Sequence, residues 1–170
     1  MTEIITTQRP ILRTPVSGDL ETLHQRIFSD KQVMRFVFGG IPLTLDRVSE
    51  FFDANFARKA TGHGLGVLVE KNSSEVVGFS GLIPCNALAE KDYEIGFVLA
   101  RSFWGQGYAT EIGYGQLNYG FGKLGCKRLL AQVAPQNIRS IAVLKKIGMS
   151  LHSETVTEGR GLRQIFIIHN

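Results

Sequence analysis

The 170-residue chain is poor in cysteine, in long apolar runs and in clustered charge. Its two cysteines, Cys85 and Cys126, form no Cys-x-x-Cys pair, and no apolar run reaches the roughly 20 residues of a membrane-spanning helix. The first residues lack the basic and apolar segments of an export signal. We therefore expect a cytoplasmic protein with reduced structural thiols and no membrane partner.

Charge and histidine content argue against several other classes of function. The net charge of +4 permits an anionic ligand. However, the basic residues are spread along the chain, whereas nucleic-acid-binding modules concentrate them on one face. The four histidines have no neighbours at metal-ligand spacing. No Gly-x-x-x-x-Gly-Lys-Ser/Thr sequence marks a nucleotide triphosphate site. We expect neither a nucleic-acid partner nor a metal.

What the chain does contain is the pattern of one globular domain, residues 1–170, with 44% hydrophobic and 20% charged residues. Hydrophobic periodicity predicts seven strands and four helices. The predicted strands are 4–13, 66–70, 76–83, 93–99, 128–134, 150–155 and 163–169. The predicted helices begin after Ser17, after Thr44, at Tyr108 and at Ile138, and Gly148 ends the last one.

The order of these elements, β-α-α-β-β-β-α-β-α-β-β, predicts an α/β protein of the α+β, mixed-sheet kind. The strand–helix–strand unit from 93 to 134 should be a right-handed crossover between parallel strands. Short connections elsewhere favour antiparallel neighbours. We expect a mixed sheet of about seven strands with helices on both faces.

A glycine-rich loop precedes the helix that begins at Tyr108. It contains Gly105 and Gly107, which let the backbone approach a ligand without a Cβ in the way. The first N–H groups of a helix have no internal partner and carry partial positive charge, so they favour phosphate. The loop therefore predicts a phosphate-binding turn.

A second segment follows the strand at 128–134. Asn137, Ser140, Leu144 and Gly148 are spaced by three, four and four residues, which places them along one helical face. Asn137 suits the N-cap of that helix.

Together the two segments resemble the GNAT acetyltransferases. That family's pyrophosphate loop has the form Gln/Arg-x-x-Gly-x-Gly/Ala. Here Gly107 and Ala109 match its small positions, and Trp104 stands where Gln or Arg is usual. The opening Thr7-Gln-Arg9-Pro-Ile11-Leu12-Arg13 is similar to the Thr-x-Arg-Leu-x-Leu-Arg start of the RimJ/RimL-type branch, whose members acetylate protein N-termini.

The family's later segment, Asn-x-x-Ala/Ser-x-x-x-Tyr-x-x-x-Gly-Phe, is matched at Asn137, Ser140 and Gly148. Leu144 replaces its Tyr and Met149 its Phe. The resemblance covers essentially the whole chain, with the elements in the right order.

The resemblance implies acetyl-CoA as co-substrate and direct transfer of acetyl to a primary amine. It implies that the pantetheine arm enters a gap between strands 93–99 and 128–134. A backbone N–H at a bulge near Val98 would serve as an oxyanion hole. The implied cofactor-binding residues are Phe97, Val98, Leu99, Trp104, Gly105, Gln106, Gly107, Tyr108, Ala109, Thr110, Asn137 and Ser140.

The resemblance does not directly assign the catalytic acid and base, because Leu144 replaces the family's Tyr general acid. Ser140, one turn earlier on the same face, is the candidate acid, and a serine hydrogen-bonded to backbone is the alternative. Glu94 is the candidate base, and a solvated or ion-paired carboxylate is the alternative. Glu154 and Glu158 are weaker rivals for the base.

We expect the acceptor to be the α-amino group of a protein or peptide, because such amines are substantially neutral at physiological pH and lysine is not. The alternatives are a small-molecule amine, such as a polyamine, amino acid or antibiotic, and a non-catalytic acyl-CoA-binding module. Residues 36–43, 84–92 and 157–163 should wall the acceptor cleft. We expect a monomer or a homodimer.

Overall fold

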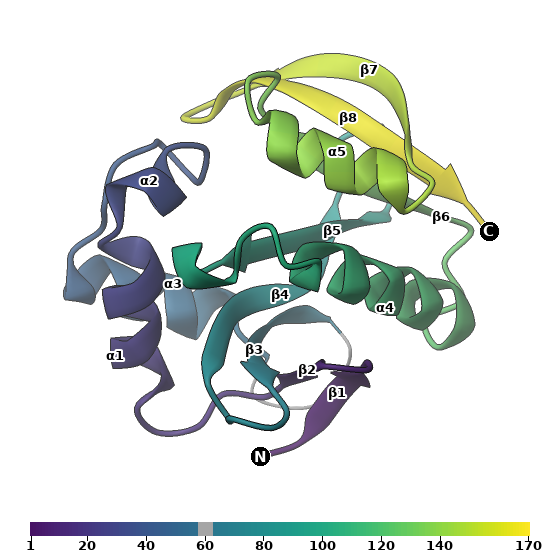
Figure 1. The fold of residues 1–170 in the computed structure, drawn as a ribbon. Helices are drawn as coiled ribbons and strands as arrows, with labels where there is room; N and C mark the ends of the chain where they lie inside the picture. Colours follow the sequence, from purple (N-terminus) through teal and green to yellow (C-terminus); the bar gives the residue numbers. More distant parts are fainter. Residues whose placement is uncertain (58–62) are drawn as a thin grey trace.

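The computed structural model describes residues 1–57 and 63–170, which fold around one sheet (Figure 1). The strands are β1 (Glu3–Thr6), β2 (Pro10–Arg13), β3 (Gly64–Glu70), β4 (Val76–Cys85), β5 (Asp92–Leu99), β6 (Arg128–Val133), β7 (Ser150–Thr157) and β8 (Gly161–His169). Their order in the sheet is β1-β2-β3-β4-β5-β6-β8-β7.

The helices are α1 (Asp19–Leu23), α2 (Lys31–Met34), α3 (Leu45–Asn55), α4 (Tyr108–Gly122) and α5 (Ile138–Lys146). A π-helical turn, η1 (His24–Phe28), follows α1, and a 3-10 turn, η2 (Arg101–Phe103), precedes the loop to α4. Among the described residues, no helix has the length and hydropathy to cross a bilayer.

The predicted mixed sheet with helices on both faces is confirmed. β5 and β6 run parallel and are joined through α4, while the other neighbouring strands pair antiparallel. The sheet has eight strands rather than seven because the strand predicted over 4–13 is a hairpin. The N–H of Thr7 donates to the Pro10 carbonyl oxygen at 3.1 Å across its turn. Proline has no N–H, and it is tolerated where it begins a strand.

The first helix begins differently from the prediction. Gly18, not Ser17, is the N-cap of α1, with φ +87° and no side-chain cap. Glycine adopts this left-handed conformation without strain. Asp19 then accepts hydrogen bonds from the Arg13 guanidinium at 2.6 and 2.9 Å, and both residues are buried. This ion pair holds the start of α1 to β2.

The other predicted helix starts are correct. Thr44 is the N-cap of α3, although its side chain makes no capping bond, and α4 begins at Tyr108. Asn137 caps α5 by accepting from the N–H of Ser140 at 3.2 Å. Gly148, after α5, has φ +94°, as expected for a residue that ends a helix.

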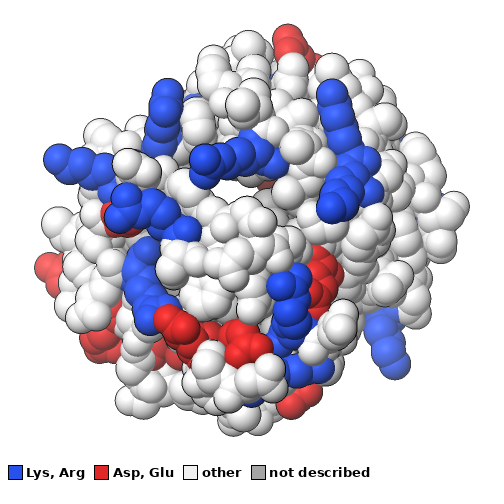
Figure 2. All heavy atoms as spheres, viewed as in Figure 1, with Lys and Arg blue, Asp and Glu red and all other residues white. Residues whose placement is uncertain are grey.

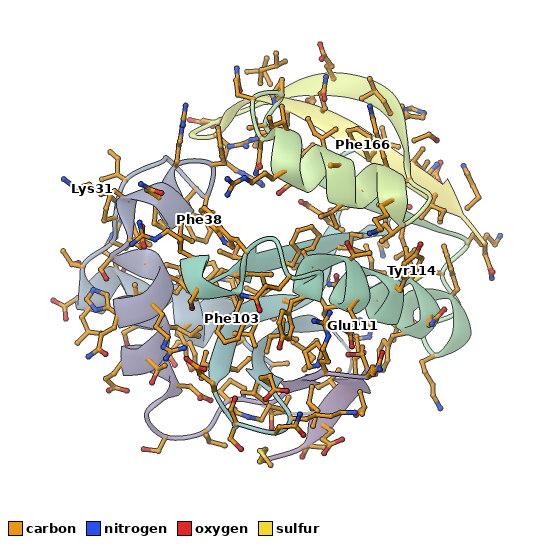
Figure 3. The ribbon with its side chains drawn as sticks, viewed as in Figure 1. Lys31, Phe38, Phe103, Glu111, Tyr114 and Phe166 are labelled. Atoms are coloured by element: carbon orange, nitrogen blue, oxygen red, sulfur yellow. The ribbon has the colours of Figure 1, made fainter. Side chains whose placement is uncertain are left out.

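Side-chain alternation along the strands separates two faces of the sheet. Ile95 of β5 packs with Phe166 of β8 in the core beneath α4 and α5, which we call the α4/α5 face (Figures 1 and 3). Phe79 of β4 lies on the other side, stacked on Phe28 at 5.4 Å between ring centroids and 6.2 Å from Phe51 of α3. We call this side the α3 face.

Candidate active site

The parallel strands β5 and β6 separate soon after they meet. Their register contains one pair, Glu94 with Leu130, so among the described residues the edge of β5 from Ile95 to Leu99 has no strand partner on that side. On its other side β5 pairs with β4 in an unbroken register along its whole length, so the bulge implied near Val98 is not present. The unpaired edge can bind an extended ligand as an added strand.

The loop between β5 and α4 has the backbone geometry of an anion site. Gly105 and Gly107 have φ values of +72° and +86°, and Gly107 is the N-cap of α4 without a side-chain cap. A Cβ built on Gly105 would meet no heavy atom within 4 Å. The indole N–H of Trp104 donates to the Leu99 carbonyl oxygen at 2.9 Å. Trp104 therefore stabilises the loop through this hydrogen bond. The first N–H groups of α4 remain available to a ligand.

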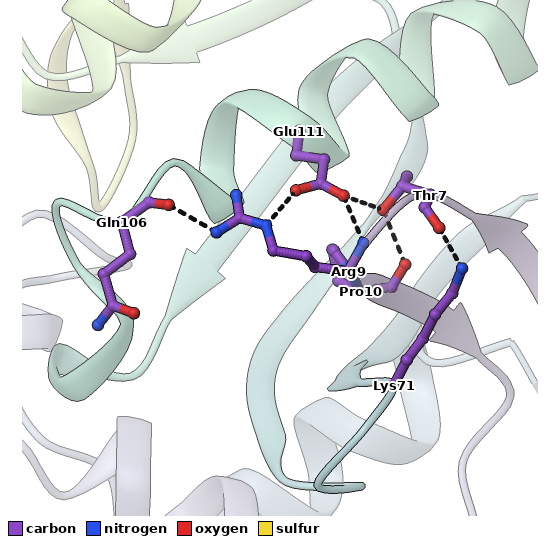
Figure 4. A network of polar contacts seen from close by, with 6 residues as sticks. All are labelled: Thr7, Arg9, Pro10, Lys71, Gln106 and Glu111. Carbon is purple, nitrogen blue, oxygen red and sulfur yellow. Dashed lines mark hydrogen bonds and ion pairs between the residues drawn. The ribbon is translucent and has the colours of Figure 1, made fainter.

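The N-terminal hairpin holds this loop in place (Figure 4). Arg9 Nη1 donates to the Gln106 carbonyl oxygen at 2.9 Å, and Arg9 Nε donates to Glu111 at 2.8 Å. Glu111, in the first turn of α4, also accepts from the Arg9 N–H at 2.7 Å and the Thr7 hydroxyl at 2.9 Å. The Lys71 ammonium donates to the Thr7 carbonyl oxygen. Thr7 and Arg9 therefore fix where α4 begins.

Two guanidinium groups add positive charge at the loop. Arg9 lies 4.4 Å from the centroid of the Tyr108 ring, and its side chain is 39% exposed. Arg139, in the first turn of α5, lies 5.1 Å from the centroid of the Trp104 ring. Guanidinium groups and a helix N-terminus both favour phosphate oxygens. The open glycine backbone and the two cations fit a pyrophosphate group.

Glu94 lies where β5 and β6 part. Its carboxylate accepts from the backbone N–H of Gln132 at 3.3 Å and from the Gln132 side-chain amide at 2.8 Å. Burial raises the pKa of Glu94, although Arg160, Gln132 and Arg163 act in the opposite direction. A carboxylate with a raised pKa is a better proton acceptor near neutral pH.

Ser140 is half-buried in the first turn of α5. Leu144, one turn later, is 3% exposed in the core beneath α5, so Ser140 lies on the inward face of the helix. In residues 1–57 and 63–170 its hydroxyl has no hydrogen-bond partner. Glu94 alternates with Ile95 and therefore points to the α3 face, whereas α5 covers the α4/α5 face. Ser140 and Glu94 thus approach the parting strands from opposite sides.

A pocket of about 360 Å³ lies between the segment after α2 and the tip of the β7–β8 hairpin. A Cβ built on Gly39 would lie 3.9 Å from the Gly159 carbonyl oxygen, so the two segments are in contact. Figure 2 shows basic side chains over this part of the surface and a hollow beside it, between α5 and the loop that precedes α4. Two of the predicted cleft walls, 36–43 and 157–163, contribute to the pocket, while 84–92 does not line it.

The family model described as an acetyltransferase (GNAT) domain matches residues 9–150. The chain belongs to the GNAT acetyltransferases. The protein YkkB of Bacillus subtilis is 32% identical over 154 residues, which cover 89% of this chain and 87% of YkkB. The prediction of an N-acetyltransferase is confirmed, and GNAT enzymes use acetyl-CoA.

Solved structures share the fold of this GNAT acetyltransferase. A candidate ribosomal-protein-serine acetyltransferase of Vibrio cholerae superposes with a TM-score of 0.81 at 18% identity, covering 99% of this chain and 98% of that one. Spermidine N-acetyltransferase of Vibrio cholerae, in complex with CoA and spermine, gives 0.75 at 18% identity, covering 94% and 95%. Because these identities are low and the two proteins differ in acceptor, they establish the fold and leave the acceptor of this enzyme open.

The predicted cofactor residues of this GNAT acetyltransferase come from three parts of the chain around the unpaired edge. Phe97, Val98 and Leu99 belong to that edge. The loop supplies Trp104, Gly105, Gln106 and Gly107; the first turn of α4 supplies Tyr108, Ala109 and Thr110; and the start of α5 supplies Asn137 and Ser140. The Tyr108 ring is 7% exposed and lies edge-on to Phe103, so Tyr108 offers a ligand its backbone.

Some site residues were not predicted. Arg9 was recognised only within the opening motif, and Glu111 was not singled out because its partners lie about a hundred residues away. Arg160 and Arg163 line the pocket and fall within the predicted wall 157–163, although neither was singled out as a ligand-binding residue, and the pairing of β8 with β6 brings them there. The glycines flanking Arg160 do signal a tight turn.

The cysteines do not provide a nucleophile. Burial raises the pKa of the Cys85 thiol to about 11, so the thiol is protonated at neutral pH. Burial also raises the pKa of Cys126. Since thiolates rather than thiols are nucleophilic, an acetyl-cysteine intermediate is disfavoured and direct transfer is favoured.

Proposed function

We propose that this GNAT acetyltransferase acetylates a primary amine, specifically the α-amino group at a protein or peptide N-terminus, as in the RimJ/RimL-type branch. The observation that carries the proposal is Glu94, a carboxylate with a raised pKa at the point where β5 and β6 part. Such a base suits an amine with a pKa of about 7.7–8.0 better than a lysine near about 10.4.

Each residue around the unpaired edge of β5 has a distinct task in this proposal. Acetyl-CoA supplies the acetyl group as a thioester. The N–H groups after Gly107, with Arg9 and Arg139, bind its phosphates, and the free edge of β5 orients the extended arm. Glu94 takes a proton from the ammonium group of the acceptor, through water or directly. The Ser140 hydroxyl donates a hydrogen bond to the departing sulfur.

The positions of the acid and the base are consistent with direct transfer. Glu94 points to the α3 face and Ser140 lies beneath α5, on the α4/α5 face. In direct transfer the amine adds to the carbonyl carbon and loses a proton, and the thiolate then leaves the tetrahedral intermediate. Glu94 can therefore accept the proton of the amine on one face while Ser140 donates a hydrogen bond to the sulfur on the other, and neither side chain has to move.

A polyamine acceptor is disfavoured by the charges around Glu94. The two nearby acidic residues are already paired: Arg128 donates to Asp92 twice at 2.8 Å and lies 3.3 Å from Glu90. Among the described residues, the pocket beside Glu94 is lined by three arginines and no carboxylate. A polyamine carries several positive charges, which these arginines repel.

The acceptor class is tested by measuring CoA release with three kinds of amine. We expect turnover with short peptides that have a free N-terminus. The same peptides, N-terminally blocked and carrying one lysine, should react at least tenfold more slowly, and so should spermidine. Faster turnover with spermidine or with the blocked lysine peptides would overturn the proposed acceptor.

A further inference from the structure

The pocket between α2 and the hairpin tip contains an unusual group of cations. Arg163 is 4% exposed, Arg160 is half-buried, and Arg35 lies at the rim, 5.0 Å from the centroid of the Phe36 ring. The Nε atoms of Arg160 and Arg163 are both buried, and neither has a hydrogen-bond partner in residues 1–57 and 63–170. The pocket therefore presents donors that no described side chain satisfies.

An unpaired buried guanidinium is costly, because it loses its hydration without gaining a partner. Burial and the neighbouring Arg160 both lower the pKa of Arg163, whereas Glu94 acts in the opposite direction. Glu94 accepts hydrogen bonds from Gln132. An anion entering the pocket would satisfy the two guanidinium groups and relieve their mutual repulsion.

The backbone around the pocket holds these groups in position. Gly159 and Gly161, on either side of Arg160, have φ +71°, which shapes the tight hairpin tip. Phe38, on the opposite wall, has φ +51°, an unfavourable conformation for a bulky residue. Its ring is fixed 4.7 Å from that of Phe51 (Figure 3). Such strain persists where packing enforces it, and it is found at ligand sites.

The arginine pocket is separate from the pyrophosphate loop. The pairing of Glu94 with Leu130, Leu130 with Ile167 and Gln132 with Ile165 places Glu94 and Arg163 on the same face of the sheet. The pyrophosphate loop instead leads into α4 on the other face. The arginines thus lie on the side of the base.

We propose that Arg160 and Arg163, with Arg35 at the rim, bind an oxyanion of the acceptor, a carboxylate close to the amine that is acetylated. This inference rests on the proposed function, since it assumes that the amine is deprotonated by Glu94. A pocket of about 360 Å³ has room for one residue or a small molecule.

Such a carboxylate can come from two sources. One is an acidic first residue, Asp or Glu, at a peptide N-terminus. The other is the α-carboxylate of a free amino acid. Both place an oxyanion within a few bonds of the α-amine, and the experiment separates them.

The test measures binding in the absence of acetyl-CoA, by calorimetry, and then CoA release. The first pair of probes is the C-terminally amidated peptides Asp-Ala-Ala and Asn-Ala-Ala. The second pair is free glutamate and its diamide, glutaminamide, which has no carboxylate. We expect at least tenfold tighter binding of the Asp peptide than of the Asn peptide, or of glutamate than of its uncharged control. Whichever pair shows the difference identifies the source.

The variants are Arg160→Gln and Arg163→Met, with Arg47→Gln as the control, since Arg47 is an exposed residue of α3 paired with Glu50. Both pocket variants should lose at least tenfold in affinity for the carboxylate probe, while Arg47→Gln keeps it. Arg163→Met should melt no lower than wild type, because it removes an unpaired charge and keeps an apolar stem. If Arg163→Met is unstable, the affinity of Arg160→Gln for the carboxylate probe tests the proposal alone.

The outcomes distinguish this inference from the proposed function. Equal affinity for charged and uncharged probes in both pairs, with turnover on neutral peptides, overturns the oxyanion site and leaves the proposed function standing. Selective binding of the carboxylate probe that depends on Arg160, without any CoA release, establishes the oxyanion site and contradicts the proposed acetylation of an α-amine. Loss of melting temperature in Arg163→Met with unchanged affinity assigns that arginine a purely structural role.

Discussion

At the scale of single residues, Glu94 has two properties that a proton acceptor needs. It is anchored, because Gln132 supplies both of its hydrogen bonds, and its pKa is raised by burial. Anchoring limits the positions of the carboxylate, and the raised pKa brings its proton affinity closer to that of an amine.

Replacing Glu94 by Gln should lower kcat/KM by about 100-fold, which is within the usual range for losing a general base. In the wild type, kcat/KM should rise with pH through the raised pKa of Glu94, because only the ionised form accepts a proton. This rise of kcat/KM with pH should be absent in Glu94→Gln. The control is Glu154→Gln, since Glu154 is an exposed residue of β7 bonded to Gln164. An unchanged kcat/KM in Glu94→Gln would remove Glu94 from the mechanism, and a loss confined to Glu154→Gln would move the base to Glu154.

Ser140 tests the other side of the reaction. Its hydroxyl is free among the described residues, whereas its N–H is bound by Asn137. Ser140→Ala should therefore reduce kcat at least tenfold while leaving acetyl-CoA affinity and melting temperature nearly unchanged. Ser140→Thr, which keeps the hydroxyl, should recover part of the rate. Full activity in the alanine variant would exclude the hydroxyl.

Gly107 tests the pyrophosphate loop. A valine there would face φ +86° and place its Cβ 3.2 Å from Arg9 Nη2, so it would disturb the loop and fill the space before α4. Gly107→Val should weaken acetyl-CoA binding more than tenfold, measured by calorimetry. Gly18→Val is a matched control, since Gly18 has φ +87° and lies before α1. Unchanged affinity in Gly107→Val would show that the phosphates bind elsewhere.

At the scale of elements, β1, β2 and α4 form one unit. Glu111 receives hydrogen bonds from Thr7 and from the Arg9 backbone and guanidinium, which join the hairpin to the first turn of α4. Burial alone would raise the pKa of Glu111, but these hydrogen bonds outweigh it and hold the pKa below its usual value. The hairpin thereby positions a helix whose N-terminus binds the ligand.

Glu111→Gln should lower the free energy of unfolding at pH 7 by about 1–2 kcal/mol, since hydrogen bonds to a charged group are lost. Because the folded-state pKa is depressed, this stabilisation is present above the unfolded-state pKa and is lost as the pH falls through the folded-state value. The two proteins should therefore converge in acid, as measured by urea unfolding. Glu50→Gln, which breaks an exposed ion pair, should change little at any pH. A pH-independent difference for Glu111→Gln would contradict this account.

At the scale of the whole molecule, β5 and β6 part within one sheet, and the core beneath α4 and α5 joins the two sides of the gap. Ile95 of β5 packs there with Leu129 of β6 and Phe166 of β8. A ligand bound along the free edge of β5 would add contacts to both sides of the gap.

Acetyl-CoA should therefore stabilise the whole protein. At about one hundred times Kd, binding adds about 2.7 kcal/mol, which corresponds to a rise in melting temperature of roughly 5–10 °C for a chain of this size. Scanning calorimetry should show one shifted transition rather than two. CoA should give a similar shift because it carries the same phosphates. No shift with either compound would contradict the cofactor site.

The sequence by itself determined the features that depend on neighbouring residues. The glycines at 105 and 107, the N-cap Asn137 and the order of strands and helices follow from spacing a few residues long. The hairpin within 4–13 was missed because its turn is short and Pro10 looked like an interruption within one strand.

Only the tertiary structure decided which distant residues meet. Arg9 contacts Glu111, 102 residues away in the chain, and Arg163 reaches the vicinity of Glu94 because β8 pairs with β6. Strand order and register are set by packing of the whole core rather than by local periodicity. For that reason the sequence indicated the reaction, and the fold was needed to show the charge around its acceptor.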